Sequence, residues 1–226
     1  MDQDFEKEPD KESTVFIWWT GIVFFTAITA IFIFVPTEKT EGPIQRIMYL
    51  HIPSAWLAFF AFFIVFISSI LFLWKKEREW DIYAHASAEI GVVFCSLVLI
   101  TGPIWAKPIW GTWWTWEPRL TTTLILFLIY VGYFMLRSFG GHPERTSRYA
   151  AVLGIIAFID VPIIFYSVQF WEEQFQSHPQ VEIMQQNSDI VVPFLISLTI
   201  FTILFLFMLR LRMHVLKIIN PRNKLK

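Results

Sequence analysis

The stretch LHIPSAWLAFFAFFIVFISSILFLW, residues 50–74, indicates the fold class most directly. It contains no Asp, Glu, Lys or Arg, and it is as long as a helix that crosses the hydrocarbon core of a bilayer, which takes about 20 residues. Apolar and polar residues do not alternate in it, so a membrane β-strand is not indicated. Because backbone polar groups in lipid must be hydrogen-bonded within the protein, the stretch predicts a transmembrane helix.

Similar apolar stretches recur along the whole chain. Of the 226 residues 55% are hydrophobic, only 16% are charged and 24 are Phe, a composition that is unusual for a soluble domain. No internal repeat and no glycine-rich phosphate loop interrupts the pattern. The sequence therefore predicts an all-α polytopic membrane protein with six transmembrane helices. The expected spans are 15–35, 50–74, 84–105, 120–136, 149–170 and 191–209.

The segments outside the spans are short. We expect one membrane domain over 15–209, preceded by an acidic, disordered cytoplasmic tail over 1–14 and followed by a basic cytoplasmic tail over 210–226. The polar N-terminal residues do not form a cleavable signal peptide. The single Cys95 excludes a disulfide within the chain and the CxxCH attachment site of c-type haem.

The distribution of basic residues predicts the orientation. Fourteen of the 18 Lys and Arg residues lie in the two tails and in the second–third and fourth–fifth connections, and four lie in the other connections. Since Lys and Arg accumulate on the cytoplasmic side, both termini are predicted to be cytoplasmic. This orientation places His51 and His178 at the outer face and the other three histidines at the inner face.

A tryptophan-rich segment over 105–121 is predicted at the same outer face as His51 and His178. Its part WGTWWTWEPRLT, residues 110–121, holds four of the 11 Trp residues of the chain. Scattered Trp residues usually form an interfacial belt, but a belt does not need a dense cluster interrupted by Gly111 and Pro118. Clustered indoles offer a flat, polarizable surface with N–H donors, which suits a large planar ligand. Lys107 or Arg119 could meet a carboxylate of that ligand.

The two outer histidines suggest which ligand this is. Taken alone, a histidine at a helix end or in a loop is more often an interfacial or solvated residue than a ligand. Neutral imidazole is, however, a common axial ligand of haem iron, and two imidazoles on opposite faces complete its coordination. Beside the tryptophan segment, His51 and His178 therefore indicate haem. Glu89 and Asp160 are acids within spans, which makes them functional candidates with no assigned role.

The segment WGTWWTWEPRLT resembles the tryptophan-rich WWD signature of the haem-handling membrane proteins of cytochrome c biogenesis. Among them the chain is most similar to the CcmC family, through three further runs and its predicted six spans. These runs are IMYLHIPSAW at 47–56, WAKPIWGTWW at 105–114 and VPIIFYSVQFW at 161–171. Glu117 stands where the signature usually has Asp.

The resemblance implies a haem carrier of the bacterial inner membrane. It implies that His51 and His178 are the axial ligands of haem b and that the signature holds the porphyrin edge. The signature residues are Trp110, Gly111, Trp113, Trp114, Trp116, Glu117 and Arg119. It further implies that haem passes to a periplasmic CcmE-like chaperone, together with ATP-binding cassette transporter subunits and a small membrane subunit. No enzymatic bond-making step is expected of the chain itself.

Three other classes of protein fit parts of the pattern. An electron-transfer cytochrome or quinol-oxidising subunit would also bind haem, but it generally places histidines deep within its spans. A haem lyase component of a cytochrome c synthetase shares the signature, but it is usually larger. A solute transporter is disfavoured because no repeated pair of Gly/Pro-broken spans is found.

Overall fold

A computed structural model describes residues 11–37, 39, 41–170 and 187–219, and these residues form helices joined by short connections, as predicted. The seven α-helices of this described part and one 3-10 helix are α1 (Lys11–Phe34), η1 (Pro43–Ile47), α2 (Met48–Lys75), α3 (Arg78–Trp110), α4 (Pro118–Phe139), α5 (Pro143–Phe158), α6 (Asp160–Phe170) and α7 (Ser188–Ile219). Residues 11–14, which were predicted to belong to a disordered tail, are the first turn of α1. At the other end of the chain α7 continues to Ile219, ten residues into the predicted basic tail.

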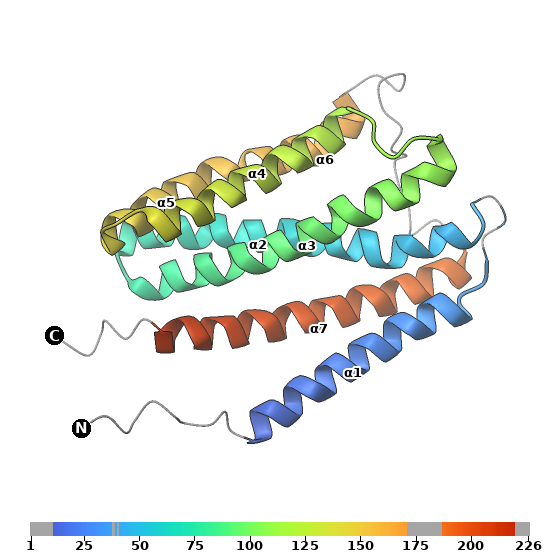
Figure 1. The fold of residues 1–226 in the computed structure, drawn as a ribbon, viewed down its shortest axis with the longest axis horizontal. Helices are drawn as coiled ribbons and strands as arrows, with labels where there is room; N and C mark the ends of the chain where they lie inside the picture. The colour runs from blue at the N-terminus through green and yellow to red at the C-terminus, as the bar shows by residue number, and fades with distance from the viewer. Residues whose placement is uncertain (1–10, 38, 40, 171–186, 220–226) are drawn as a thin grey trace.

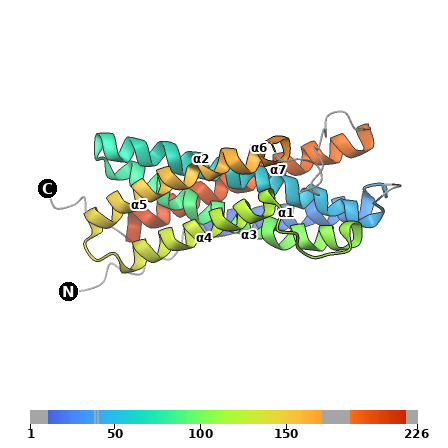
Figure 2. The same ribbon diagram turned by 90° about the horizontal axis from the view of Figure 1, so that it is seen from above.

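The helices run along one long axis and form an elongated bundle (Figures 1 and 2). At one end, which we call the terminal end, α1 begins and α7 ends (Figure 1). At the other end α3 connects to α4 through residues 111–117, and we call it the tryptophan end. The α1–α2 connection and the start of α7 lie at the tryptophan end as well. His51, in the first turns of α2, therefore shares an end of the bundle with the tryptophan segment, as predicted.

Five stretches of the described part are long and apolar enough to cross a membrane. They correspond to the predicted second to sixth spans, and the predicted fifth span combines α5 and α6. The predicted first span corresponds to the helix α1, whose apolar part, Phe24–Phe34, is shorter than the five stretches above. The helices are longer than the predicted spans, as in α3, which begins at Arg78 and continues to Trp110, whereas the predicted span covers 84–105.

The fifth span is interrupted at Ile159, where α5 ends and α6 begins one residue later. Pro162 has no N–H group to donate to the carbonyl of Phe158, so the α-helical ladder cannot continue through this turn. Asp160 is the first residue of α6. The interruption therefore lies in the turn where Pro162 removes a backbone donor.

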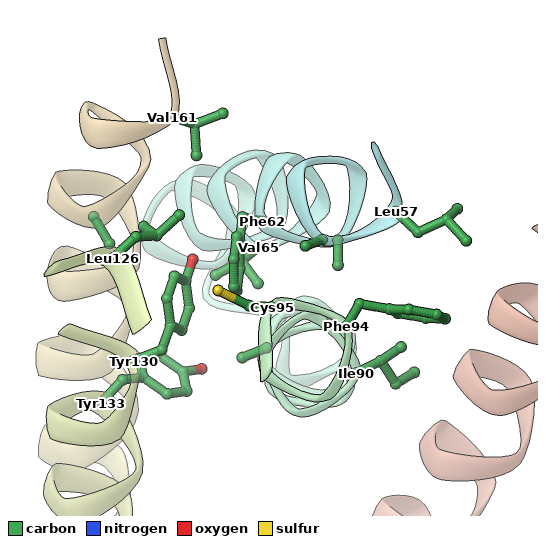
Figure 3. Packing of buried hydrophobic residues seen from close by; sticks show 14 of the residues in the cluster. Leu57, Phe62, Val65, Ile90, Phe94, Cys95, Leu126, Tyr130, Tyr133 and Val161 are labelled. Carbon is green, nitrogen blue, oxygen red and sulfur yellow. The ribbon is translucent and has the colours of Figure 1, made fainter. Parts of the chain in front are cut away.

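The core of the bundle lies where α2, α3 and α4 meet. Phe62 of α2 is fully buried and stacks on Tyr130 of α4, with 4.0 Å between ring centroids and 17° between planes. Cys95 of α3 is buried beside them (Figure 3). Gly91, one turn before Cys95, lets α2 and α3 approach closely, because a Cβ atom there would lie 2.6 Å from Phe62 Cε1. A small residue at a helix contact is a common way to bring two membrane helices together.

Charged residues connect four helices at the terminal end. Glu89 of α3 accepts hydrogen bonds from Arg212 of α7, and His85 Nε2 lies 3.4 Å from Glu89 Oε1. Arg137 Nη1 of α4 donates to Asp81 Oδ1 of α3 at 2.9 Å, and Ser147 of α5 donates to the other carboxylate oxygen. His85 and Glu89 are four residues apart on one face of α3, whereas Arg212 comes from a helix far along the chain.

A cavity of about 490 Å³ opens beside these pairs, lined by His85, Glu89, Phe134, Arg137 and Ser138. His85, Glu89 and Arg137 already have ionic or hydrogen-bond partners in the protein. The polar lining of this cavity is therefore explained by contacts between helices. It lies at the opposite end of α3 from the tryptophan segment.

Candidate functional site

His51 is held by the end of α3 that faces it. Its Nδ1 atom lies 2.8 Å from Thr101 Oγ1, and the Thr101 hydroxyl also lies 2.7 Å from the carbonyl oxygen of Leu97. A carbonyl oxygen can only accept, so the single hydroxyl proton of Thr101 points to Leu97. The hydroxyl oxygen must then accept from His51, which places the ring proton on Nδ1. The lone pair of the neutral imidazole consequently stands on Nε2.

Two more residues of α3 surround the His51 ring. The Trp105 ring meets it edge to face, with 5.7 Å between centroids and 74° between planes. Trp105 Nε1 donates to Glu41 Oε2 at 3.1 Å, so this indole is itself oriented from the α1–α2 connection. At Gly102 a Cβ atom would lie 3.4 Å from His51 Cε1, which shows how closely the backbone of α3 approaches the imidazole.

The start of α7 packs against the same turn of α2. Tyr49, next but one to His51, is fully buried, and its carbonyl oxygen accepts a hydrogen bond from Ser197 of α7. Phe194 of α7 belongs to the same apolar cluster as Tyr49, and Trp105 packs on its edge. The predicted second ligand, His178, lies outside the described residues. Its segment, 171–186, joins α6 to the helix that packs beside His51.

Residues 111–117 of the tryptophan segment connect α3 to α4, and they begin where α3 ends. Gly111 adopts a left-handed conformation, with φ 74°, and its N–H donates to the Lys107 carbonyl, which ends the helix. Lys107 Nζ donates to the Gly111 carbonyl at 2.7 Å, so Lys107 serves the end of this helix. Glu117 is extended, and Pro118 is the first residue of α4, a favoured position for proline. The segment is thus a short connection fixed at both ends.

The tryptophans of the segment 110–116 are either exposed or half-buried. Trp113 is 58% exposed and Trp116 is 76% exposed, whereas Trp110 and Trp114 are half-buried. Trp114 and Trp116 meet edge to face, with 5.9 Å between centroids. The Trp114 Nε1 and Thr115 Oγ1 atoms are buried and have no hydrogen-bond partner among the residues that the structure describes. The segment therefore presents indole faces outward and keeps unused donors within it.

Glu117 and Arg119 continue the site into α4. Glu117 is only 4% exposed, although it precedes the helix. Arg119 Nη2 donates to the carbonyl of Phe165 at 3.3 Å, which joins the start of α4 to α6. The Arg119 Nε atom is buried and lacks a partner within the described part of the chain. Within the described residues the guanidinium thus donates to the Phe165 carbonyl and keeps one buried donor without a partner.

The structure brings together His51 and the α3 residues Thr101, Gly102 and Trp105, at the start of the tryptophan segment. Thr101 and Gly102, which contact the His51 ring, and Glu41, which accepts from Trp105, were not predicted to belong to the site. The one signal for Thr101 is its spacing of four residues from Trp105, which puts both on one face of a helix. Hydropathy cannot show which residue of α2 that face meets.

The arrangement lacks the ligand set of a metal ion bound by side chains alone. No group of three or more His, Cys, Asp or Glu residues suitable for a metal ion occurs in the described ranges. What the described site has instead is one oriented imidazole, outward-facing indoles and unused N–H donors. Haem iron already has four porphyrin nitrogens, so it needs only one or two ligands from the protein.

These observations define a class: polytopic all-α membrane proteins with an aromatic segment and an oriented histidine at one end of the bundle. Comparison with known proteins identifies the family within this class. The chain belongs to the Heme exporter protein C (CcmC) family, which matches residues 3–225. The resemblance of the tryptophan signature is confirmed by this match.

Individual relatives support the same assignment. Heme exporter protein C of Bradyrhizobium diazoefficiens is 37% identical over 172 residues, which are 75% of this chain and 65% of that protein. A putative cytochrome c biosynthesis ccmC-like mitochondrial protein of Marchantia polymorpha is 33% identical over 83% of this chain and 80% of its own length. Heme exporter protein C of Escherichia coli K12 is 34% identical over 77% of this chain and 71% of its own length.

Proposed function

We propose that this protein binds haem b at the tryptophan end and delivers it to a periplasmic haem chaperone during cytochrome c biogenesis. His51 and His178 are the axial ligands in this proposal, and the tryptophan segment holds the porphyrin. Haem is the cargo, and the chain carries out no bond-making step on it. The observation that carries the proposal is the hydrogen bond between His51 Nδ1 and Thr101, because it assigns the ring proton to Nδ1 and so makes Nε2 the nitrogen that can coordinate iron.

The side chains at the tryptophan end fit a haem in three respects. The indoles of Trp113 and Trp116 offer exposed faces to a flat ring. The unused N–H groups of Trp114 and Arg119 are donors that a propionate carboxylate could accept from. The end of α6 and the start of α7, between which His178 lies in the sequence, are at the end of the bundle where His51 lies.

The proposal includes six membrane spans, with α1 as the first, and cytoplasmic termini. The apolar stretch of α1 is short, but the helix has 24 residues and packs beside α7, so it can cross with its polar first turn at the surface. The orientation rests on the excess of Lys and Arg at the terminal end. It puts the haem site on the periplasmic face of a bacterial inner membrane.

The partners in this proposal are those of a cytochrome c maturation system. A CcmE-like haem chaperone would receive the haem at the tryptophan end, where Trp113 and Trp116 are exposed. ATP-binding cassette transporter subunits and a small membrane subunit would contact the bundle within the membrane. Co-purification of the tagged full chain with each of these partners tests this part separately from haem binding.

The absorption spectrum of the protein purified in detergent tests haem binding. We expect the spectrum of bis-imidazole haem in the wild type and its loss in His51→Ala and in His178→Ala. His142→Ala is the matched control, because His142 is exposed at the start of α5 at the terminal end. Haem that co-purifies equally with the wild type and both ligand variants would contradict the ligand assignment.

A second measurement separates haem delivery from electron transfer. For a haem carrier we expect slow reduction of the bound haem by a quinol and its transfer to the chaperone. Rapid reduction by quinol without transfer would favour an electron-transfer subunit.

A further inference from the structure

Thr101 is placed to act on His51 through a defined proton arrangement. The hydroxyl donates to Leu97 O at 2.7 Å and accepts from His51 Nδ1 at 2.8 Å, and no other assignment of its one proton satisfies both contacts. The chain of donors therefore runs in one direction, from imidazole to hydroxyl to backbone carbonyl. The last acceptor belongs to the rigid helix α3, so the imidazole is oriented by an element of fixed geometry.

The surroundings of the ring support the same orientation. Trp105 is one turn beyond Thr101 on α3 and meets the ring edge to face, and a Cβ atom at Gly102 would lie in van der Waals contact with Cε1. A ring turned by half a rotation about its bond to Cβ would bring a carbon atom opposite the Thr101 oxygen and lose the hydrogen bond. The face of α3 formed by Thr101, Gly102 and Trp105 thus favours one orientation and one tautomer of His51.

We propose that Thr101 is a positioning residue for haem binding, which keeps His51 in the Nδ1–H tautomer and makes its Nε2 atom the iron ligand. This inference rests on the proposed function of His51. A hydrogen bond from Nδ1–H makes the imidazole a more basic ligand and fixes its plane. Hydrogen bonding behind an axial ligand is also one of the ways in which a protein adjusts the potential of a haem.

Two variants separate the hydroxyl from the shape of the side chain. Thr101→Val has the same shape but neither donates nor accepts, and Thr101→Ser keeps the hydroxyl. Thr202→Val is the matched control: Thr202 of α7 makes the same bond to the carbonyl four residues earlier, at 2.7 Å to Leu198 O, and is likewise at least partly buried. It tests the cost of losing this backbone bond without affecting His51.

The first readout needs no haem. Nitrogen-15 NMR of histidine-labelled full-length protein in detergent distinguishes the two tautomers of a neutral imidazole. We expect His51 to have the Nδ1–H tautomer in the wild type, in Thr101→Ser and in Thr202→Val. In Thr101→Val we expect a mixture of tautomers. A wild-type tautomer pattern in Thr101→Val would overturn the proposal, whatever the variant does to haem.

The second readout is titration of the purified apo-protein with haemin, followed by reductive titration of the complex. Loss of such a supporting hydrogen bond typically lowers affinity about 10–100-fold, which is the fall expected for Thr101→Val. The midpoint potential should rise in Thr101→Val, because a less basic imidazole stabilises ferric iron less. Thr101→Ser should restore both values, and Thr202→Val should leave both unchanged.

The outcomes distinguish this inference from the proposed function. If His51→Ala abolishes haem binding while Thr101→Val keeps the wild-type affinity and potential, positioning by Thr101 is refuted and His51 remains a ligand. If His51→Ala binds haem as the wild type does, the ligand assignment fails and the inference fails with it. An equal loss of affinity in Thr101→Val and Thr202→Val, with no change in potential, would show that Thr101 matters only for the helix.

Discussion

Replacing Gly91 by Ala tests how closely α2 and α3 must pack. The added Cβ would lie 2.6 Å from Phe62 Cε1, 2.9 Å from Phe62 Cδ1 and 3.1 Å from Ala61 Cβ. Non-bonded carbon atoms prefer separations of about 3.5–4.0 Å, so Phe62 or a whole helix must move by roughly 1 Å. Phe62 is fully buried and stacked on Tyr130, which leaves it no open space to enter.

The magnitude follows from three contributions. Overpacking of a well-packed core costs about 1–3 kcal/mol, and loss of the aromatic stack about 0.5–1.5 kcal/mol. The higher helix propensity of Ala offsets about 0.8–1.0 kcal/mol of this. We therefore expect the free energy of unfolding to fall by about 1–3 kcal/mol. Reversible unfolding in mixed detergent micelles, followed by circular dichroism, measures this difference.

The control and the rescue use the same chain. At Gly132 of α4 a Cβ atom meets nothing within 4 Å, so Gly132→Ala should be neutral or stabilise by up to about 1 kcal/mol. In the Gly91→Ala background, Phe62→Leu should cost less than it does alone, with a coupling of about 1 kcal/mol or more. A Gly91→Ala protein as stable as Gly132→Ala, or additive effects of Gly91→Ala and Phe62→Leu, would refute the reasoning.

Two further predictions concern the ends of the bundle. Trp113→Ala and Trp116→Ala should change the free energy of unfolding by at most about 0.5 kcal/mol, because both rings are exposed, yet each should weaken haem binding about 2–10-fold through loss of a stacking surface. Trp74→Ala, which removes an exposed ring at the terminal end, should leave haem affinity unchanged. Haem titration and unfolding curves of the three variants test this, and an unchanged affinity in Trp113→Ala and Trp116→Ala would contradict it. Arg212→Ala should lower the free energy of unfolding by about 1–3 kcal/mol, because it leaves the partly buried Glu89 without its cation. Lys217→Ala should cost at most about 1 kcal/mol, because the Lys217 and Glu79 side chains of that ion pair are 44% and 55% exposed. Equal losses in the two unfolding experiments would contradict this.

The sequence predicts the helices well because each membrane segment carries its own signal in its length and hydropathy. The tryptophan segment was predictable for a related reason: Gly111 and Pro118 are the residues that end one helix and begin the next. Basic residues also predicted that His51 shares its end of the bundle. These are local properties, or properties that alternate from one connection to the next.

The contacts between helices were not predictable in this way. His85 and Glu89 are four residues apart, so their pairing follows from helix geometry, but Arg212 reaches Glu89 from 123 residues away. Thr101 and His51 are 50 residues apart, and their hydrogen bond depends on the register of α2 against α3 along the helix axes. The amino-acid sequence alone gives no signal for this register. Close contact at a small residue, as at Gly91, determines it in three dimensions.

This dependence connects the core of the bundle to the site. The same two helices, α2 and α3, make the His51–Thr101 contact and the Phe62–Gly91 contact. The two contacts share one antiparallel register, because Phe62 comes eleven residues after His51 and Gly91 comes ten residues before Thr101. Helices are stiff along their axes, so a slide of α3 by roughly 1 Å at Gly91 would reach Thr101 nearly undiminished. The bond of 2.8 Å between His51 Nδ1 and Thr101 Oγ1 would then exceed the usual limit of about 3.2 Å. If Gly91→Ala is accommodated by such a slide, the tautomer signature of His51 should change as it does in Thr101→Val; if Phe62 alone turns aside, stability should fall while the signature stays that of the wild type.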